Sequence, residues 1–392
     1  MNDALPRGRW DAVRHRSLAL GLVALVLCVA VAFISPRQVF RAYLAAYVFW
    51  IGIPLGCWGL LMLHHLVGGR WGFVIQRVLE SGIQTFPLMV LFFVPLLFGL
   101  HHIYPWAQPD VVAADPVLQE KSRYLNVPLF IARAVFYFAI WITVGRLLTK
   151  WSLEQDRTAD VTLTRKLQRL SGPGLLLYGL TVTFSAIDWV MSLEPHWYSS
   201  IYGILYMVGY GLAALALSII LCWLREGEQP LARVISSDRF HDLGNMLLAL
   251  VMLWAYVNFS QFLLMWMANL AEEVPWYLHR LNGGWQWVAL ALVLFQFALP
   301  FLLLLSRSTK RRAPTLALVA AAIVFMHWLD MQWLIAPSFY PAQFHLHWMD
   351  MIAFIGIGGV WLAVFVGYLR AHPALPLRDP RFSELFQEAQ EA

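Results

Sequence analysis

Ten long apolar runs dominate the sequence and constrain its fold more than any other feature. A helix needs ~20 apolar residues to cross the ~30 Å hydrocarbon core of a membrane, so each run predicts one transmembrane helix. We therefore predict an all-α, polytopic membrane protein. The runs begin near Ser17, Val39, Gly72, Val127, Gly172, Trp197, His241, Trp285, Ala313 and Phe344.

The composition supports this class and excludes several others. Of the 392 residues, 60% are hydrophobic and 13% are charged, whereas a soluble domain is about half apolar and a quarter charged. The longest connections have roughly 25 residues and are too short to hold a domain. The sequence contains neither a Walker motif nor GxGxxG, which excludes ATP-driven chemistry and nicotinamide binding within this chain.

The distribution of basic residues predicts the orientation. Of the 28 lysines and arginines, five lie on one side of the predicted helices (Arg37, Arg41, Lys121, Arg123 and Arg280), three lie within them, and the other twenty lie on the other side. Because cytoplasmic loops are rich in Lys and Arg, both termini are predicted to be cytoplasmic. The same basic residues sit in short loops, so the net charge of +5 does not indicate nucleic acid as a partner. The predicted parts are a cytoplasmic N-terminus (1–16), a transmembrane domain (17–371) and a cytoplasmic tail (372–392).

Ionisable side chains within the apolar runs are the candidate functional residues. A charged group at mid-bilayer costs about 2.5–3.5 kcal/mol on insertion scales, and such residues usually pair and mark a pathway. Three pairs are spaced i,i+3, so that both members share a helix face. The candidate proton path consists of Asp188, His327, Asp330, His347, Asp350, Glu80, Arg77 and His241.

Depth estimates divide these residues into two groups. At ~1.5 Å per residue, Asp188 and Asp330 lie ~24 Å from the cytoplasmic start of their helices, and Arg133 and Asp350 lie ~9 Å below the outer surface. The outer third is thus expected to collect Asp188, Arg133, His327, Asp330, His347 and Asp350. The inner half is expected to collect Arg77, Glu80, His64, His65, His241 and Asp242. Asp188, Arg133, Asn258 and Gln261 are also candidate contacts for a quinol.

Structural roles remain open for several of these groups. Arg77 and Glu80 can be an ion pair that fixes helix packing, Asp242 can cap the helix that opens at His241, and Glu194 beside Pro195 can simply end its helix. No metal site is predicted, because the three cysteines are dispersed and lie in apolar runs. The histidines do not repeat at a spacing suited to stacked hemes.

A weak internal repeat relates the fifth and ninth runs. Asp188 and Asp330 each precede a proline, Pro195 or Pro337, by seven residues, and both runs are predicted to point outward. This pattern suggests a parallel duplication of a four-helix unit, with the second to fifth helices in one unit and the sixth to ninth in the other. The first and tenth helices then flank the two units.

Several long segments resemble one protein family. They are FSAIDWVMSLEPHW (184–197) with YSSIYG (198–203), FHDLGNML (240–247), WAYVNFSQ (254–261) and WYLHR (276–280). They resemble the second NrfD-like membrane subunit ("quinone-binding subunit 2") of alternative complex III, a bacterial quinol:cytochrome c oxidoreductase. The resemblance covers roughly residues 40 to 370. The short region before the first helix departs from the family pattern.

The resemblance implies two four-helix bundles with two peripheral helices, in the bacterial inner membrane. It implies as partners a second NrfD-like membrane subunit, an iron–sulfur protein and c-type heme subunits, besides membrane lipid. Those partners would carry the hemes c and the iron–sulfur clusters, so this chain is expected to bind no redox cofactor itself, with quinol or menaquinol as the only candidate ligand. The subunit resembled here is more often assigned a proton-conducting role.

From residues and resemblance together we predict a membrane subunit that supports proton transfer coupled to quinol oxidation. Three alternatives remain open at this point. The chain can bind quinol directly in the same complex, it can be an inert scaffold for electron-transfer subunits, or it can be a solute transporter.

Overall fold

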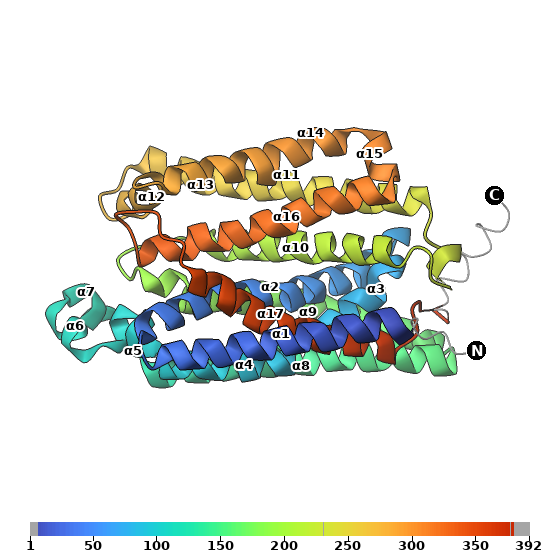
Figure 1. Ribbon diagram of the computed structural model, residues 1–392, viewed down its shortest axis with the longest axis horizontal. Coiled ribbons are helices and arrows are strands. Elements are labelled where there is room, and N and C mark those ends of the chain that lie inside the picture. Colours follow the sequence, from blue (N-terminus) through green and yellow to red (C-terminus); the bar gives the residue numbers. More distant parts are fainter. Residues whose placement is uncertain (1–6, 230, 377, 380–392) are drawn as a thin grey trace.

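The computed structural model describes residues 7–229, 231–376 and 378–379, and this part of the chain contains helices and no strand. Within these described ranges, ten helices are long and apolar enough to cross a membrane, and they run along one common axis (Figure 1). The prediction of an all-α polytopic protein is thereby confirmed. The spanning elements are α1 (Arg7–Ala32), α2 (Pro36–Val67), α3 (Arg70–Ile83) with α4 (Phe86–Phe98), α8 (Val127–Thr158), α9 (Val161–Trp189), α10 (Tyr202–Leu224), α11 (Ser237–Ala268), α13 (Trp285–Ala291) with the π-helix η4 (Leu292–Ala298) and α14 (Leu299–Leu305), α16 (Ala313–Ile335) and α17 (Trp348–Ala371).

Short helices fill the connections between these spans. They are α5 (Leu100–Ile103), η1 (Pro105–Ala107), α6 (Pro109–Ala114), α7 (Pro116–Lys121), η2 (Met191–Leu193), η3 (Leu231–Arg233), α12 (Val274–Leu281), α15 (Arg307–Arg311) and η5 (Ala336–Ser338).

Several spanning helices begin at other residues than the apolar runs do. Helix α9 begins at Val161 rather than near Gly172, because the side chain of Asp160 accepts a hydrogen bond from Thr162 N and caps a polar first turn. Helix α17 begins later than predicted, at Trp348 instead of Phe344. Hydropathy locates the apolar centre of a helix, whereas its ends depend on capping groups, and this accounts for both differences.

Helices α2 and α10 pack against each other in the middle of the molecule. Figure 1 shows α11, α13, α14 and α16 together on one side of this pair, with α4 and α8 on the other. The contact is close at Gly56, where a Cβ atom would lie 2.0 Å from the carbonyl oxygen of Tyr210. Helix α1 lies along α17, and the two approach closely through Gly21 and Gly359.

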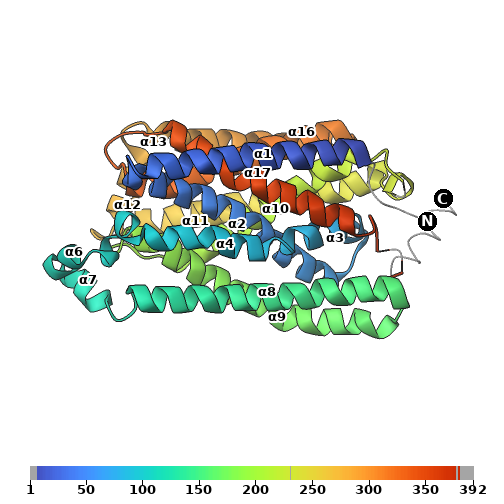
Figure 2. The ribbon, with the colours of Figure 1, turned by 60° about the horizontal axis from the view of Figure 1, so that its bottom comes forward.

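The two ends of the bundle carry different elements. The Arg7 end of α1 and the Ala371 end of α17 lie at the same end as α15, which we call the terminal end (Figure 1). The opposite end carries α6, α7 and α12 (Figure 2). The terminal end is the predicted cytoplasmic side, and that orientation stays a prediction. Residues 1–6 of the predicted N-terminus and most of the tail, 380–392, lie outside the described residues.

Candidate functional site

Asp188 forms a buried ion pair near the opposite end of the bundle. Its side chain, on α9, is 1% exposed and accepts hydrogen bonds from Arg133 Nε at 2.8 Å and Arg133 Nη2 at 2.9 Å. The hydroxyl of Tyr137 donates to the same carboxylate at 2.8 Å. Arg133 and Tyr137 are spaced i,i+4 on α8, so they share one face. Asp188 and Arg133 were expected to lie together from their matching depth, and this contact confirms that expectation.

Two further tyrosines, in the connection before α8, surround this pair. The guanidinium carbon of Arg133 lies 3.9 Å from the ring centroid of Tyr124, and Tyr104 donates to the carbonyl oxygen of Trp189 at 2.8 Å. Burial, together with the negative charge of Asp188, raises the pKa of Tyr104 and of Tyr124 above the ordinary value. Both phenols therefore stay neutral, and Arg133 is the cation that balances Asp188.

A second ion pair at the opposite end joins Glu194 to Arg280. Arg280, on α12, is fully buried, and its Nη1 donates to Glu194 Oε1 at 2.9 Å. The Ser338 hydroxyl donates to the same oxygen at 2.6 Å, and the guanidinium stacks on Trp276 at 3.7 Å. From the sequence, Glu194 was expected only to end its helix, and Arg280 was expected in a loop. The i,i+4 spacing of Trp276 and Arg280 was the one signal for a buried, stacked arginine.

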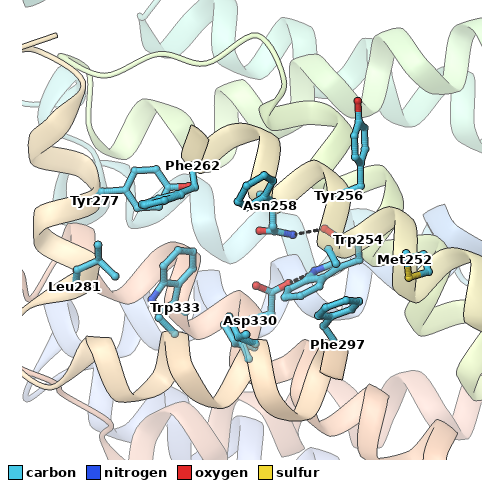
Figure 3. Close-up of a pocket in the computed structure, with 15 residues that line it drawn as sticks. Met252, Trp254, Tyr256, Asn258, Phe262, Tyr277, Leu281, Phe297, Asp330 and Trp333 are labelled. Atoms are coloured by element: carbon cyan, nitrogen blue, oxygen red, sulfur yellow. Dashed lines mark hydrogen bonds between the residues drawn. The ribbon is translucent and has the colours of Figure 1, made fainter. Parts of the chain in front are cut away.

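Asp330, on α16, lies next to a large cavity. Asp330 is only 3% exposed, and its Oδ2 accepts a hydrogen bond from Trp254 Nε1 at 3.0 Å, whereas its buried Oδ1 has no hydrogen-bond partner among the residues that the structure describes. Figure 3 shows the carboxylate directed from α16 towards α11, between Trp254 and Asn258. His327, one turn earlier, is fully buried, with Nδ1 3.9 Å from Asp330 Oδ2. The predicted pair therefore shares a face.

We call this cavity the Asp330 pocket. It has a volume of about 540 Å³ and lies between α11, α12, α13–η4 and α16. Asn258 lines it, and its Nδ2 donates to the carbonyl oxygen of Trp254 at 2.9 Å. Gln261 lies elsewhere, bonded to the Ser199 hydroxyl at 2.5 Å. The lining residues are Met252, Trp254, Ala255, Tyr256, Asn258, Phe259, Phe262, Tyr277, Leu281, Ala289, Leu292, Val293, Phe297, Asp330 and Trp333.

A third polar network lies near the terminal end, where Arg77 of α3 contacts both Glu80 and Asp156. The Ser152 hydroxyl and Gln76 Nε2 donate to Glu80 Oε1 at 2.6 and 2.9 Å. The predicted Arg77–Glu80 pair is thus one part of a larger buried network between α3 and α8. Ser152 and Asp156 were not predicted as members of this network, because they lie next to the basic residues of a predicted loop.

His372 follows α17 near the same network. Burial lowers the pKa of His372 below its ordinary value, and the positive charges of Arg77 and Arg157 lower it further, while Glu80 acts in the opposite direction. The imidazole therefore favours its neutral form at neutral pH.

His347 and Asp350 form a capping box at the start of α17. Asp350 Oδ2 accepts a hydrogen bond from the backbone N–H of His347 at 2.7 Å, and His347 Nδ1 accepts one from Met349 N at 3.2 Å. This arrangement provides acceptors for backbone N–H groups of the first turn that have no partner within the helix, and it gives both residues a structural role. Their predicted role as a proton carrier and a relay stays a prediction.

His241 lies within α11 rather than at its start, because the helix begins at Ser237. Its Nδ1 is 3.4 Å from Asn245 Nδ2. The predicted capping role of Asp242 is wrong for the same reason, and its carboxylate lies 3.8 Å from Arg239 instead.

The predicted outer group is divided in the structure. Asp188 lies with Arg133 and Tyr137, Asp330 lies with Trp254 and His327, and Asp350 lies with His347. Within the described ranges, no hydrogen bond or ion pair joins one of these sets to another. The three acids therefore belong to three separate clusters.

Comparison with known protein families and with curated proteins found no match to this chain.

Proposed function

We propose that this chain is an integral membrane subunit of a respiratory quinol:cytochrome c oxidoreductase, and that its buried ionisable side chains conduct protons released by quinol oxidation. The motifs within 184–203, 240–261 and 276–280, which resemble the second NrfD-like subunit of alternative complex III, support the redox setting. Under this proposal a second NrfD-like subunit, an iron–sulfur protein and c-type heme subunits in the bacterial inner membrane carry the electrons.

One observation carries the proton role. Helix α8 presents a polar network at each end of its buried face, with Ser152 and Asp156 near the terminal end and Tyr137 and Arg133 near the opposite end. Ionisable groups inside a span are costly and usually mark ion pathways. These two networks on one helix support the proposal, because a proton route requires both an entry and an exit.

The stretch between the two networks contains hydroxyl groups. Tyr137 and Ser152 are separated along α8 by about 22 Å, from the rise of an α-helix. Thr149 lies on the same buried face, and Thr181 of α9 accepts a hydrogen bond from Trp141 Nε1 at 2.9 Å. Transfer along this face would require water molecules between these side chains, with Glu80 and Asp188 as its terminal carboxylates.

Asp188→Asn tests the proposal in the complete complex. We expect lower quinol:cytochrome c turnover and less proton release into a vesicle lumen, measured with a pH-sensitive dye, while the subunits still co-purify. Asp238→Asn is the control, because Asp238 is an exposed carboxylate paired with Arg311 at the surface. Normal turnover and normal proton release in both Asp188→Asn and Glu80→Gln would refute the proton role and favour an inert scaffold.

A further inference from the structure

We propose that a groove between α1, α2 and α4 binds one anionic phospholipid, with an acyl chain in the groove and the phosphate against Arg37 at its mouth. We call this cavity the α4 groove. It has a volume of about 520 Å³, and its walls include Leu25, Val29, Phe40, Tyr43, Leu91 and Val94. The inference goes beyond the proposed function, because it requires neither a proton route nor a quinol.

The interior of the α4 groove offers no free polar group to a ligand. Among the residues that line it, only Tyr43 and Cys28 carry polar side-chain atoms. The Tyr43 hydroxyl donates to the carbonyl oxygen of Phe92 at 2.9 Å, and Cys28 Sγ donates to Met349 Sδ at 3.9 Å. A polar ligand group placed there would lose its water without gaining a partner. The segment that fills the groove must therefore be hydrocarbon.

The α4 groove is elongated along the helices and open at its side. The lining extends from Leu91 to Phe98 along α4, which is ~10 Å of helix axis. Val29 and Leu91 are 59% and 64% exposed, so this side faces lipid if α1 and α4 span the membrane. The volume of about 520 Å³ is within the range of small-molecule sites. An acyl chain that enters sideways from the bilayer fits this shape.

Positive charge gathers at the mouth of the groove. Phe40, which lines the groove, stacks on the ring of His102 with the ring centroids 5.7 Å apart. His102 lies in α5, outside the spanning helices. Burial lowers the pKa of His102, and the positive charges of His101, Arg37 and Arg41 lower it further. The charges that act on His102 are thus all positive, and they complement an anion.

Arg37 is the cation best placed for a phosphate. It is spaced i,i+3 from Phe40, so the two share a face of α2, and Arg37 lies ~4.5 Å nearer the end of the bundle. Its side chain is exposed and forms no ion pair with any residue that the structure describes. Arg41, one turn further along α2, stacks on Phe339 instead, with its guanidinium carbon 4.8 Å from the ring centroid.

A hydrocarbon groove that ends at a free arginine fits an amphiphile with an anionic head. Guanidinium groups bind phosphate oxygens through charge-assisted and often bidentate hydrogen bonds. A zwitterionic lipid carries the same phosphate, but its own ammonium group balances the charge, so its attraction to Arg37 is weaker. Only five of the 28 lysines and arginines are predicted on this side, which makes two arginines within one turn of α2 a distinct local feature.

The test is photolabelling of the full-length chain in phosphatidylcholine nanodiscs. The two probes are phosphatidylglycerol and phosphatidylcholine, each with a diazirine in the same acyl chain. The phosphatidylglycerol probe should label peptides within 25–33 and 91–98 saturably, with an affinity about tenfold higher than that of the other probe. Equal labelling by the two probes would mean that the groove holds only bulk lipid, and would overturn the proposal.

Substitution of the arginine tests the head group. Arg37→Gln should abolish the preference for phosphatidylglycerol, whereas Arg37→Lys should keep most of it. Arg123→Gln is the matched control, because Arg123 is also an exposed arginine, in the connection before α8. An equal loss of preference in Arg123→Gln and Arg37→Gln would show a general attraction to positive charge and would contradict a site at Arg37.

A second matched pair tests the location of the tail. Val94→Trp fills the groove and should abolish saturable labelling, whereas Val135→Trp, on α8, 63% exposed and outside the groove, should leave it unchanged. Normal labelling in Val94→Trp would refute the groove as the site.

Other occupants are distinguished in two ways. Tighter binding of a fatty acid with the same diazirine chain would rule out the phospholipid as the ligand. With a photoreactive amino acid in place of Val94, crosslinking in the native membrane should give a lipid adduct. A polypeptide adduct would mean that another protein helix fills the groove, and the proposal would fail.

Discussion

Removing the positive charge of Arg133 should destabilise the protein far more than removing the negative charge of its partner, Asp188. Arg133→Met leaves Asp188 as a buried charge that is 1% exposed, without its cation but still with the hydrogen bond from Tyr137. Breaking a buried ion pair in this way costs about 3–5 kcal/mol. The remaining hydrogen bond from Tyr137 was present before the change, so it offsets none of that cost.

Asp188→Asn should cost less, for a reason visible at Arg133. The arginine is 18% exposed and stacks on Tyr124, so its charge keeps access to solvent and to a π-face when the carboxylate is gone. The expected loss of stability is the difference in strength between charge-assisted and neutral hydrogen bonds, which is about 1–2 kcal/mol. In the double variant no buried charge remains, so it should be more stable than Arg133→Met alone.

Unfolding in nanodiscs, followed by near-UV circular dichroism against denaturant, measures these differences. The coupling between the two substitutions should be at least about 1 kcal/mol. Additive effects of the two single substitutions, or a larger loss in Asp188→Asn than in Arg133→Met, would refute the reasoning that Asp188 depends on Arg133 as its ion-pair partner.

Three further outcomes follow from the packing and charges. Arg280→Met should cost about 2–4 kcal/mol in the same unfolding assay, because it leaves the partly buried Glu194 without its cation. Gly21→Leu should loosen α1 from α17 and speed proteolysis of α1, since a Cβ at Gly21 would lie 2.6 Å from Val360 N. Because the pKa of His372 is lowered on folding, its protonation favours the unfolded chain, so the Tm of the native protein should fall more steeply below pH 6.5 than the Tm of His372→Gln.

The sequence predicts the number and class of the helices because transfer of apolar side chains into lipid is a local property of each run. It also predicts pairs that share one helix, such as Arg77 with Glu80 and His327 with Asp330, because the i,i+3 spacing fixes a common face. Contacts between helices are harder to predict, because the depth of a residue in the membrane does not show which helix faces meet. Arg133 and Asp188 have matching depth and do meet.

Depth failed to predict which other residues gather. Asp350 was expected to share a cluster with Asp188, yet it caps the first turn of α17, because that helix begins at Trp348. The pair of Glu194 and Arg280 was missed, because both residues lie in connections where charge is normally solvated. Such pairs depend on how a connection folds back over the bundle, and hydropathy carries no information about that.

The contrast between Asp188 and Asp330 separates two uses of a buried acid. Asp188 is satisfied from within the chain by a cation and a phenol, so its charge is balanced before any ligand or proton arrives. Asp330 accepts a hydrogen bond from Trp254 Nε1, lies 3.9 Å from His327 Nδ1 and borders a cavity. A carboxylate whose charge is balanced by groups of the same chain suits a fixed position on a proton path. A carboxylate with an unsatisfied oxygen suits a partner that binds reversibly. Under the predicted repeat, α9 and α16 carry the same acid, and the donors that surround each acid decide which use it has.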